Sequence, residues 1–385
     1  MKTYKIYSSY TQLPVAWHGV SAHDIFLQVT YFKALEASTP QHITCYYIGV
    51  FVDENLVGIA LVQHVKLYLK DMFRKTNVSF IKSQLQASIS KLLKGNILVV
   101  GNLMHTGQHG MYYEANSISY TNYVNCIFNA LDTLKSRIKE NHNKTIRIVM
   151  FKDFFTSDTV YNNKILFSFK KLHHVFVQPN MVMPVKKTWL TIDDYTSSLT
   201  KKYRARYKRA NKKLGAIVCR ELNLEAVKSN ASVLFSLYSN VSKNAKFNTF
   251  TLTQNHFYQL KLELKSNFKV FGYYLNDELI GFYTLILNGN VLETYFLGYD
   301  TKHQQPNQLY LNMLYSMVNF AINNKFKAII YARTAIEIKS SVGAKPEAMS
   351  IYLKHTNAFA NMLLNQVFKF MNPSQDWKER HPFKD

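Results

Sequence analysis

The sequence of 385 residues is poor in cysteine, glycine, proline and acidic residues. Its three cysteines, Cys45, Cys126 and Cys219, are odd in number and far apart, which excludes a disulfide framework and a zinc site of clustered cysteines. We expect all three to be reduced and buried. With only 13 glycines and 8 prolines, the chain belongs to neither the fibrous nor the low-complexity class.

Long hydrophobic runs are absent as well. No apolar run reaches the roughly 18 residues of a membrane-spanning helix, and the N-terminal segment lacks a continuous apolar core of signal-peptide length. These absences predict a cytoplasmic protein. The 47 Lys and Arg residues outnumber the 24 Asp and Glu residues, giving a net charge of +23. Such a charge attracts anions and leaves open a peripheral association with the anionic inner membrane surface.

The length and composition indicate two globular domains. A chain of 385 residues exceeds what one hydrophobic core usually organises, and 47% of its residues are hydrophobic. An internal repeat supports the division, because residues 48–62 (IGVFVDENLVGIALV) align without a gap onto residues 271–285 (FGYYLNDELIGFYTL). Both copies read as strand, acidic turn and strand, and a further strand and a helical pattern follow each copy.

The boundary between the two domains is expected near residues 178–184 (QPNMVMP), which gives an N-terminal domain of residues 1–184 and a C-terminal domain of residues 185–385. Thr191 can cap a helix beyond the boundary, with Asp193 and Asp194 in its first turn. We expect this helical region to continue through Tyr195 and Leu199 into the basic stretch of residues 201–214.

The basic stretch KKYRARYKRANKKL predicts an amphipathic helix. Its apolar face consists of Tyr203, Tyr207, Ala210 and Leu214. A cationic stripe beside this face consists of Lys202, Arg206, Arg209 and Lys213, whereas Lys201, Lys208 and Lys212 point away from it. Three interpretations of this positive charge stay open. The helix binds nucleic acid, it binds a phosphate-bearing molecule in a groove, or its charged face is solvated and has no specific ligand.

Several segments together resemble a known family. The segment TWLTIDDYTSSL leads into KYR-x-R-Y-KR, and the hairpin KVFGYYLNDELIGFYTLIL, the strand VLETYFLGYD and the loop TKHQQPNQ follow. Over residues 185–345 this order resembles the second half of Fem-like and other double-domain members of the GNAT acyltransferase superfamily. The resemblance implies an α/β fold of two GNAT-like halves, each a central mixed sheet flanked by helices. It also implies an N-acyltransferase that uses an acyl-CoA or similarly activated co-substrate, an amine acceptor and no tightly bound cofactor.

The resemblance places the donor's pyrophosphate at the helix start within residues 302–310. The usual glycine-rich turn is missing there, which puts coenzyme A in doubt and keeps Fem-like aminoacyl transfer from transfer RNA open. The residues expected to bind the donor are Lys202, Arg204, Arg206, Arg209, Gln305, Asn307 and Gln308. A glycine-bearing loop at residues 101–110 of the first half is an alternative phosphate site or a flexible turn.

The candidates for catalysis are two carboxylates and a tyrosine. Glu293 lies in an apolar strand and shares a face with Tyr295, the third catalytic candidate, while Glu337 follows the segment YARTAI. Arg333 and Lys339 flank Glu337 and are expected to bind substrate. No metal is expected, since His105 and His109 have no carboxylate or cysteine at ligand spacing.

The alternative from another class is a non-catalytic protein that binds nucleic acid or an anionic surface through the basic helix.

Overall fold

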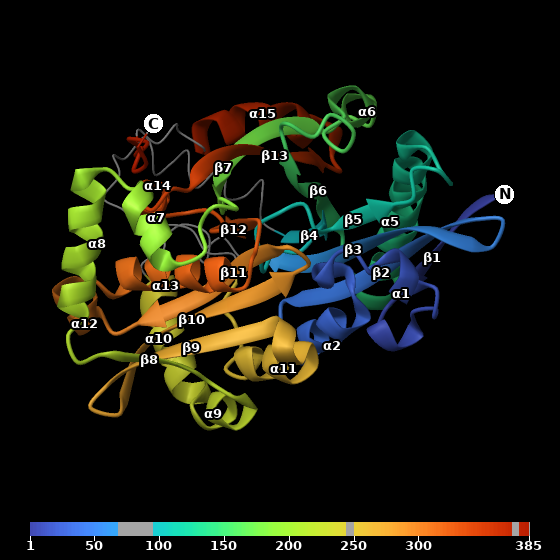
Figure 1. Ribbon diagram of the computed structural model, residues 1–385. Coiled ribbons are helices and arrows are strands. Elements are labelled where there is room, and N and C mark those ends of the chain that lie inside the picture. The colour runs from blue at the N-terminus through green and yellow to red at the C-terminus, as the bar shows by residue number, and fades with distance from the viewer. Residues whose placement is uncertain (68–94, 244–249, 372–376, 385) are drawn as a thin grey trace, which may run out of the picture. The chain divides into compact units, whose positions relative to one another are not determined.

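The computed structural model describes residues 1–67, 95–243, 250–371 and 377–384. The chain forms two compact units, and each unit is drawn from separate parts of the sequence. Unit 1 comprises the described residues within Met1–Val177, Lys246–Thr251 and Ala348–Ser374, and unit 2 those within Gln178–Ala245, Leu252–Glu347 and Gln375–Asp385. The predicted ranges 1–184 and 185–385 follow the chain order, whereas the units do not (Figure 1).

The sheet of unit 1 has the strand order β1-β2-β3-β4-β6-β13, with β5 paired to β3. The pair β4 and β6 is parallel and the others are antiparallel. The strands are β1 (Lys2–Tyr7), β2 (Ile43–Val52), β3 (Asn55–Leu67), β4 (Gly95–Val100), β5 (Met111–Tyr113), β6 (Ile146–Phe155) and β13 (Lys345–His355).

The sheet of unit 2 repeats this arrangement with the order β8-β9-β10-β11-β12-β7. Here β11 and β12 form the parallel pair and the other pairs are antiparallel. The strands are β7 (His173–Pro184, of which residues 173–177 belong to unit 1), β8 (Val218–Glu221), β9 (Phe268–Leu275), β10 (Glu278–Asn288), β11 (Val291–Tyr299) and β12 (Ala328–Ile330). The identical order and direction of six strands confirm the predicted fold class of two mixed-sheet halves.

The repeated hairpins form as the sequence predicts. β2 and β3 are joined by Asp53 and Glu54, with φ of 47° and 69°, and β9 and β10 by Asn276 and Asp277, with φ of 48° and 63°. Positive φ at both central residues is typical of the type I′ turn, whose twist matches that of paired strands.

Helices lie on both sheets. Those of unit 1 are α1 (Trp17–Val20), α2 (Val29–Ser38), α5 (Tyr120–His142), α6 (Lys164–Phe169) and α15 (Ala358–Met371). Those of unit 2 are α7 (Ile192–Ser198), α8 (Lys201–Leu214), α9 (Leu224–Ser229), α10 (Ala231–Ser242), α11 (His256–Leu264), α12 (Thr301–Asn307), α13 (Leu309–Asn323) and α14 (Ile336–Ser340). Three short 3-10 helices span Tyr10–Gln12, Ile25–Leu27 and Lys265–Asn267.

The long helices bury one apolar face each. In α5, Val124, Ile127, Leu131 and Leu134 recur at helical spacing and are buried against the strands of unit 1. In unit 2, α13 contacts β10, β11 and β12 and contributes its leucines and methionines to the core. Each unit therefore has a core of its own between sheet and helices.

The last strand of each sheet comes from an unexpected part of the chain. Residues 178–184, predicted to be a boundary segment, lie inside β7, where Val182, Met183 and Pro184 pair with β12. The corresponding strand of unit 1 is β13, which the chain reaches only after the other strands of unit 2. The predicted boundary segment is therefore a strand, because its apolar residues complete a sheet.

The predicted continuous helix is interrupted. Leu199 is extended, and the chain forms α7 and α8 instead of one helix. The break is held by the C-terminal segment, since Leu199 forms a β-bridge with Phe383 and the Thr200 N–H donates to the Pro382 carbonyl at 2.8 Å. The prediction missed a partner that lies almost 200 residues away in sequence.

The cysteine prediction is partly wrong. Cys45 and Cys126 are buried and reduced as expected, but Cys219 is exposed. Its strand, β8, is the outermost strand of the unit 2 sheet and has an exposed side chain at each of its four positions.

Candidate functional site

The basic helix α8 is docked on the core of unit 2 by the face that the sequence indicates. Ala210 is fully buried, Tyr203 is nearly so, and Tyr207 packs edge-to-face on Tyr315 of α13 with ring centroids 4.8 Å apart. The Asn312 side chain of α13 donates to the Ala210 carbonyl at 2.9 Å. Packing and this buried hydrogen bond fix the rotation of α8, and with it the direction of each cation.

The cationic stripe borders a groove of about 430 Å³. The groove lies entirely within unit 2. Its lining residues are Lys202, Tyr203, Arg206, Arg209, Glu337, Ile338 and Arg380. Three of the four residues in the predicted stripe therefore share one groove with Glu337, whereas Lys201, Lys208 and Lys212 are exposed elsewhere on the helix.

Sequence reasoning missed Arg380. This residue belongs to the C-terminal segment, whose Arg380 N–H donates to the Ser340 hydroxyl at 3.1 Å. The Arg380 guanidinium donates to the Glu337 carboxylate, and this bond raises the pKa of Arg380 above its ordinary value. No periodic pattern surrounds Arg380 in the sequence, so only its basic character could have suggested it.

The charge of the groove is positive. Lys202, Arg206, Arg209 and Arg380 contribute four cations, and Glu337 contributes one carboxylate. The positive charge of α8 also acts on residues outside the groove. Burial raises the pKa of Tyr315 to about 12, and the charge of Arg206 opposes that rise. The arrangement can attract an anion and can hold it with planar guanidinium groups, which suit phosphate oxygens.

Arg204 binds backbone carbonyls and is not part of the groove. Its guanidinium donates to three backbone carbonyls at the end of α7, those of Thr196 at 3.2 Å, Ser197 at 3.1 Å and Leu199 at 2.9 Å. These carbonyls lie at and just beyond the end of α7, where intrahelical donors run out, although the Thr196 carbonyl also accepts from the Leu199 N–H at 3.2 Å. Arg204 does not line the groove and instead stabilises the break between α7 and α8.

Lys339 and Arg333 lie next to the groove without lining it. Lys339 is 5% exposed, and its ammonium donates to the Arg333 carbonyl at 2.6 Å and the Ala332 carbonyl at 3.4 Å. Burial lowers the pKa of Lys339 to about 7. The loop that it holds is strained, with positive φ at Ala332, Thr334 and Ala335. Lys339 therefore fixes the loop that leads into Glu337.

The expected pyrophosphate site at residues 302–310 covers α12 and the start of α13, and of these two helices α12 has a side-chain cap at its start. The Asp300 carboxylate accepts from the Lys302 N–H at 2.8 Å and caps α12, so an anion there would meet a carboxylate. Gln305 is exposed, Asn307 donates to the Lys213 carbonyl at 2.9 Å, and Gln308 links α12 to α13 with φ of 49°. Asn307 thus contacts α8, and none of the three residues lines the groove.

Glu293 and Tyr295 lie on a central strand. β11 pairs with β10 on one side and β12 on the other, and Glu293 is only 5% exposed. The Tyr295 hydroxyl and the buried His256 Nε2 are 3.1 Å apart, a contact that the sequence did not suggest. Glu293 does not line the groove that contains Glu337, so the two predicted carboxylates belong to different surroundings.

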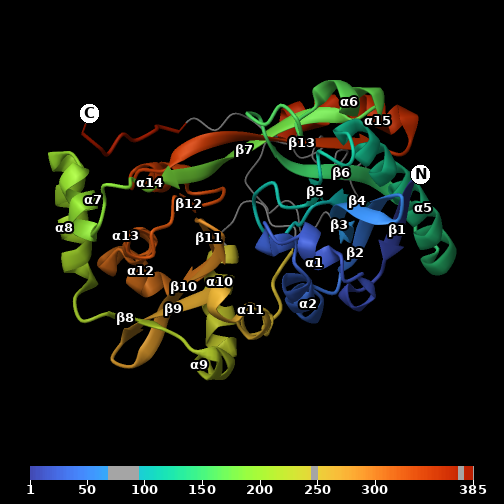
Figure 2. The ribbon, with the colours of Figure 1, turned by 45° about the vertical axis from the view of Figure 1, so that its right-hand side comes forward.

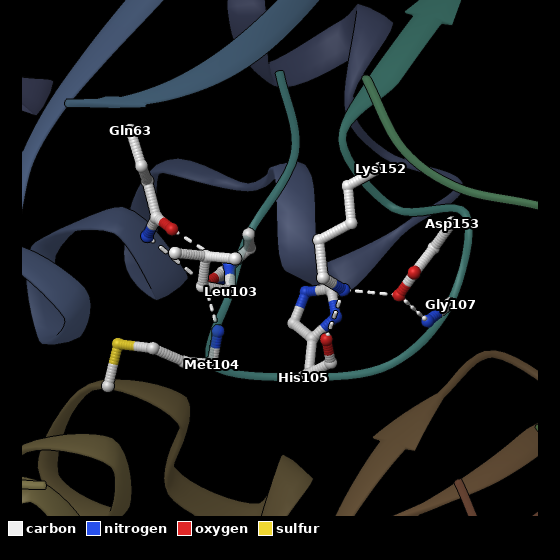
Figure 3. A network of polar contacts seen from close by, with 8 residues as sticks. Gln63, Leu103, Met104, His105, Gly107, Lys152 and Asp153 are labelled. Atoms are coloured by element: carbon white, nitrogen blue, oxygen red, sulfur yellow. Dashed lines mark hydrogen bonds and ion pairs between the residues drawn. The ribbon is translucent and has the colours of Figure 1, made fainter. Parts of the chain in front are cut away.

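Side chains form hydrogen bonds with the backbone of the glycine-bearing loop of unit 1, residues 101–110 (Figure 3). The Leu103 N–H donates to Gln63 Oε1 at 2.8 Å, and the Gly107 N–H donates to Asp153 Oδ2 at 3.2 Å. Lys152 pairs with Asp153 and donates to the His105 carbonyl at 2.7 Å. Because protein acceptors already satisfy these amides, the loop is not the open amide nest that a phosphate needs.

Metal ligands do not cluster in the described part of the chain. No group of three or more His, Cys, Asp or Glu residues there could hold a metal ion. His109 instead pairs through Nδ1 with the Asp24 carboxylate at 2.8 Å.

The fold is shared with solved structures. FemX matches with a TM-score of 0.53 and 10% sequence identity over 88% of this chain and 96% of that chain. A tandem GNAT protein from the clavulanic acid biosynthesis pathway matches with a TM-score of 0.52 and 7% identity over 92% of this chain and 99% of that chain. The protein thus has the Fem-like tandem GNAT fold. No family model and no curated protein sequence matches the chain.

Among the helices described, none is long and apolar enough to cross a membrane.

Proposed function

We propose that this protein is an N-acyltransferase and that the groove of unit 2 binds a phosphate-bearing donor. The observation that carries the proposal is the convergence of Lys202, Arg206, Arg209 and Arg380 on one groove that also contains the Glu337 carboxylate. A volume of about 430 Å³ falls in the range of small-molecule sites. The fold, which FemX and the tandem GNAT protein share, supports acyl transfer as the reaction class.

The reaction requires little covalent work from the protein. The lone pair of a neutral amine attacks the acyl carbonyl of the donor, the C–N bond forms, and the thiolate or alkoxide leaves. The nitrogen loses its proton to a carboxylate, for which Glu293 and Glu337 are the candidates. Positive charge beside the leaving group holds the donor in place and stabilises developing negative charge.

Charge supports the groove over the start of α12 as the site for the anionic part of the donor. The groove has an excess of three positive charges, whereas the start of α12 is capped by Asp300. The donor remains an acyl-CoA or a similarly activated ester, and aminoacyl transfer from transfer RNA of the Fem-like kind is the second candidate. Its support is the same basic helix, whose outward lysines could contact a longer nucleic-acid backbone.

The test compares two double variants that each remove two positive charges. Arg206→Ala with Arg209→Ala removes cations from the groove, and Lys201→Ala with Lys212→Ala removes cations from the exposed face. Affinity for acetyl-CoA, for coenzyme A and for a short RNA is measured by titration calorimetry at two salt concentrations. We expect the groove variant to lose about 1–3 kcal/mol of acetyl-CoA binding per lost contact and the matched control to lose almost nothing.

Other outcomes are equally informative. Equal losses from both variants, with equal reductions in the salt dependence of RNA binding, would favour the nucleic-acid-binding protein over the enzyme. If the parent protein binds RNA in the groove but neither acetyl-CoA nor coenzyme A, an acyl-CoA donor is excluded, and a transfer assay with aminoacyl-tRNA then separates the Fem-like enzyme from the nucleic-acid-binding protein.

A further inference from the structure

Unit 1 carries a group of large apolar side chains that face solvent. More than half of each side chain is exposed, although the residues come from three separate elements. They are Ile165 and Phe169 of α6, Phe176 of β7, and Phe359 and Met362 of α15. We call this group the α6–α15 surface. Single exposed hydrophobic residues are normal, whereas several together mark an interaction site.

The members of this surface are close together in space. Asn361 of α15 donates from its side chain to the Lys171 carbonyl, directly after α6, at 3.1 Å. The Phe176 ring packs edge-to-face on His174 with centroids 4.8 Å apart. The His174 ring in turn lies 5.0 Å from the ring of Tyr352, which stacks on Phe167 of α6 at 4.2 Å, so these ring contacts connect Phe176 to α6. Figures 1 and 2 both show α6 beside α15.

Helices α6 and α15 carry exposed apolar residues in addition to those that they bury in the core. Helix α6 already buries Leu166 and Phe167, and Ile165 and Phe169 occupy its other face. Helix α15 already buries Ala360 and Leu364, whereas Phe359 and Met362 lie on its exposed side. A surface helix of a protein that meets only water has polar residues on this side.

Lysines surround the surface. Lys164 and Lys171 are exposed at the two ends of α6, and Lys170 and Lys354 are partly exposed beside them. Lys170 and Lys354 lie close together, since their ammonium groups lie 5.3 and 5.1 Å from the centroid of the same ring, that of Phe128. A second copy related by a twofold axis would bring such lysines face to face, which like-charge repulsion disfavours.

We propose that the α6–α15 surface binds the protein to an anionic lipid membrane. The apolar side chains enter the boundary between headgroups and acyl chains, and the lysines contact the anionic headgroups, which is the combination that peripheral membrane binding requires. The net charge of +23 acts in the same direction over a longer range. This inference is independent of the proposed acyl transfer, since it concerns unit 1 and needs no donor.

The experiment measures partition of the full chain into vesicles. Vesicles of phosphatidylcholine with phosphatidylglycerol are compared with vesicles of phosphatidylcholine alone by flotation. The surface variant is Phe169→Ser with Phe359→Ser, and the matched control is Val15→Ser with Leu190→Ser, which removes two similarly exposed apolar side chains elsewhere. Exposed positions are chosen so that both variants fold, and their melting temperatures check this.

We expect the parent and the control to bind the anionic vesicles alike, and the surface variant to bind them at least tenfold more weakly. Lys164→Glu with Lys171→Glu should weaken binding in the same way and should remove most of its salt dependence. No binding by the parent, or equal binding by surface variant and control, overturns the proposal. A dimer in sedimentation velocity that only the surface variant breaks would identify a second copy as the partner and also overturns it.

Discussion

The buried ammonium of Lys339 gives a pH dependence that can be worked out in advance. Lys339 is 5% exposed, its partners are two backbone carbonyls, and no carboxylate pairs with it among the residues described. Burial lowers its pKa to about 7, from about 10.4 in the unfolded chain. The perturbation is Lys339→Met, which keeps a long side chain and removes the titrating group.

The sign follows from proton counting. Between about pH 7 and pH 10.4 the unfolded chain carries a proton on Lys339 and the folded protein does not, so stability rises with pH in this window. Below about pH 7 both states are protonated and the full cost of burying the charge is present. At about 1.36 kcal/mol for each pH unit, the parent should gain roughly 2–4 kcal/mol over Lys339→Met between about pH 7 and pH 10.

Urea unfolding of both proteins at several pH values within this window measures the effect. Loss of the carbonyl hydrogen bonds lowers the stability of the variant by a similar amount at every pH, so the slope and not the offset reports the titration. The exposed Lys345→Met serves as control and should follow the parent. Parallel curves for the parent and Lys339→Met would refute the assignment of a neutral, buried lysine.

Two further outcomes test the site and the fold. Glu293→Gln should lower turnover more than donor affinity if this buried carboxylate accepts the amine proton, and unchanged activity across pH would transfer the role to Glu337, whose Gln variant is measured in parallel. Gly298→Ala should destabilise the protein by about 1–3 kcal/mol in thermal unfolding, because a Cβ there would lie 2.6 Å from the backbone oxygen of Leu237. The control Gly19→Ala adds a Cβ with no atom within 4 Å and should be tolerated. Equal melting temperatures of the two variants would contradict this packing.

Local features of the fold could be read from the sequence. The hairpins around Asp53 and Asn276 follow from an apolar run on each side of a polar turn, because such a pattern is typical of two paired strands joined by a short turn. The buried face of α8, with Tyr203 and Ala210, follows from a helical period of 3.6. Such patterns are local, so they can be recognised in the sequence without knowing which distant residues contact them.

The composition of the groove could be predicted only in part. Helical geometry was sufficient to separate Arg206 and Arg209 from the exposed lysines, since their relative directions are fixed by the helix itself. The same reasoning placed Arg204 among the donor-binding residues, because it could not show that the side chain turns back to the α7 carbonyls, which depends on the break at Leu199. That break depends in turn on the C-terminal segment.

The sequence by itself determined the duplicated hairpins, the amphipathic basic helix and the excess of positive charge, all of which are properties of residue order and composition. The tertiary structure alone decided that Arg380 meets Glu337, that β13 completes the sheet of unit 1, and that α6 and α15 expose their apolar residues side by side. These contacts join residues far apart in the chain, and their energies depend on which surfaces the whole fold leaves available, which no local period encodes.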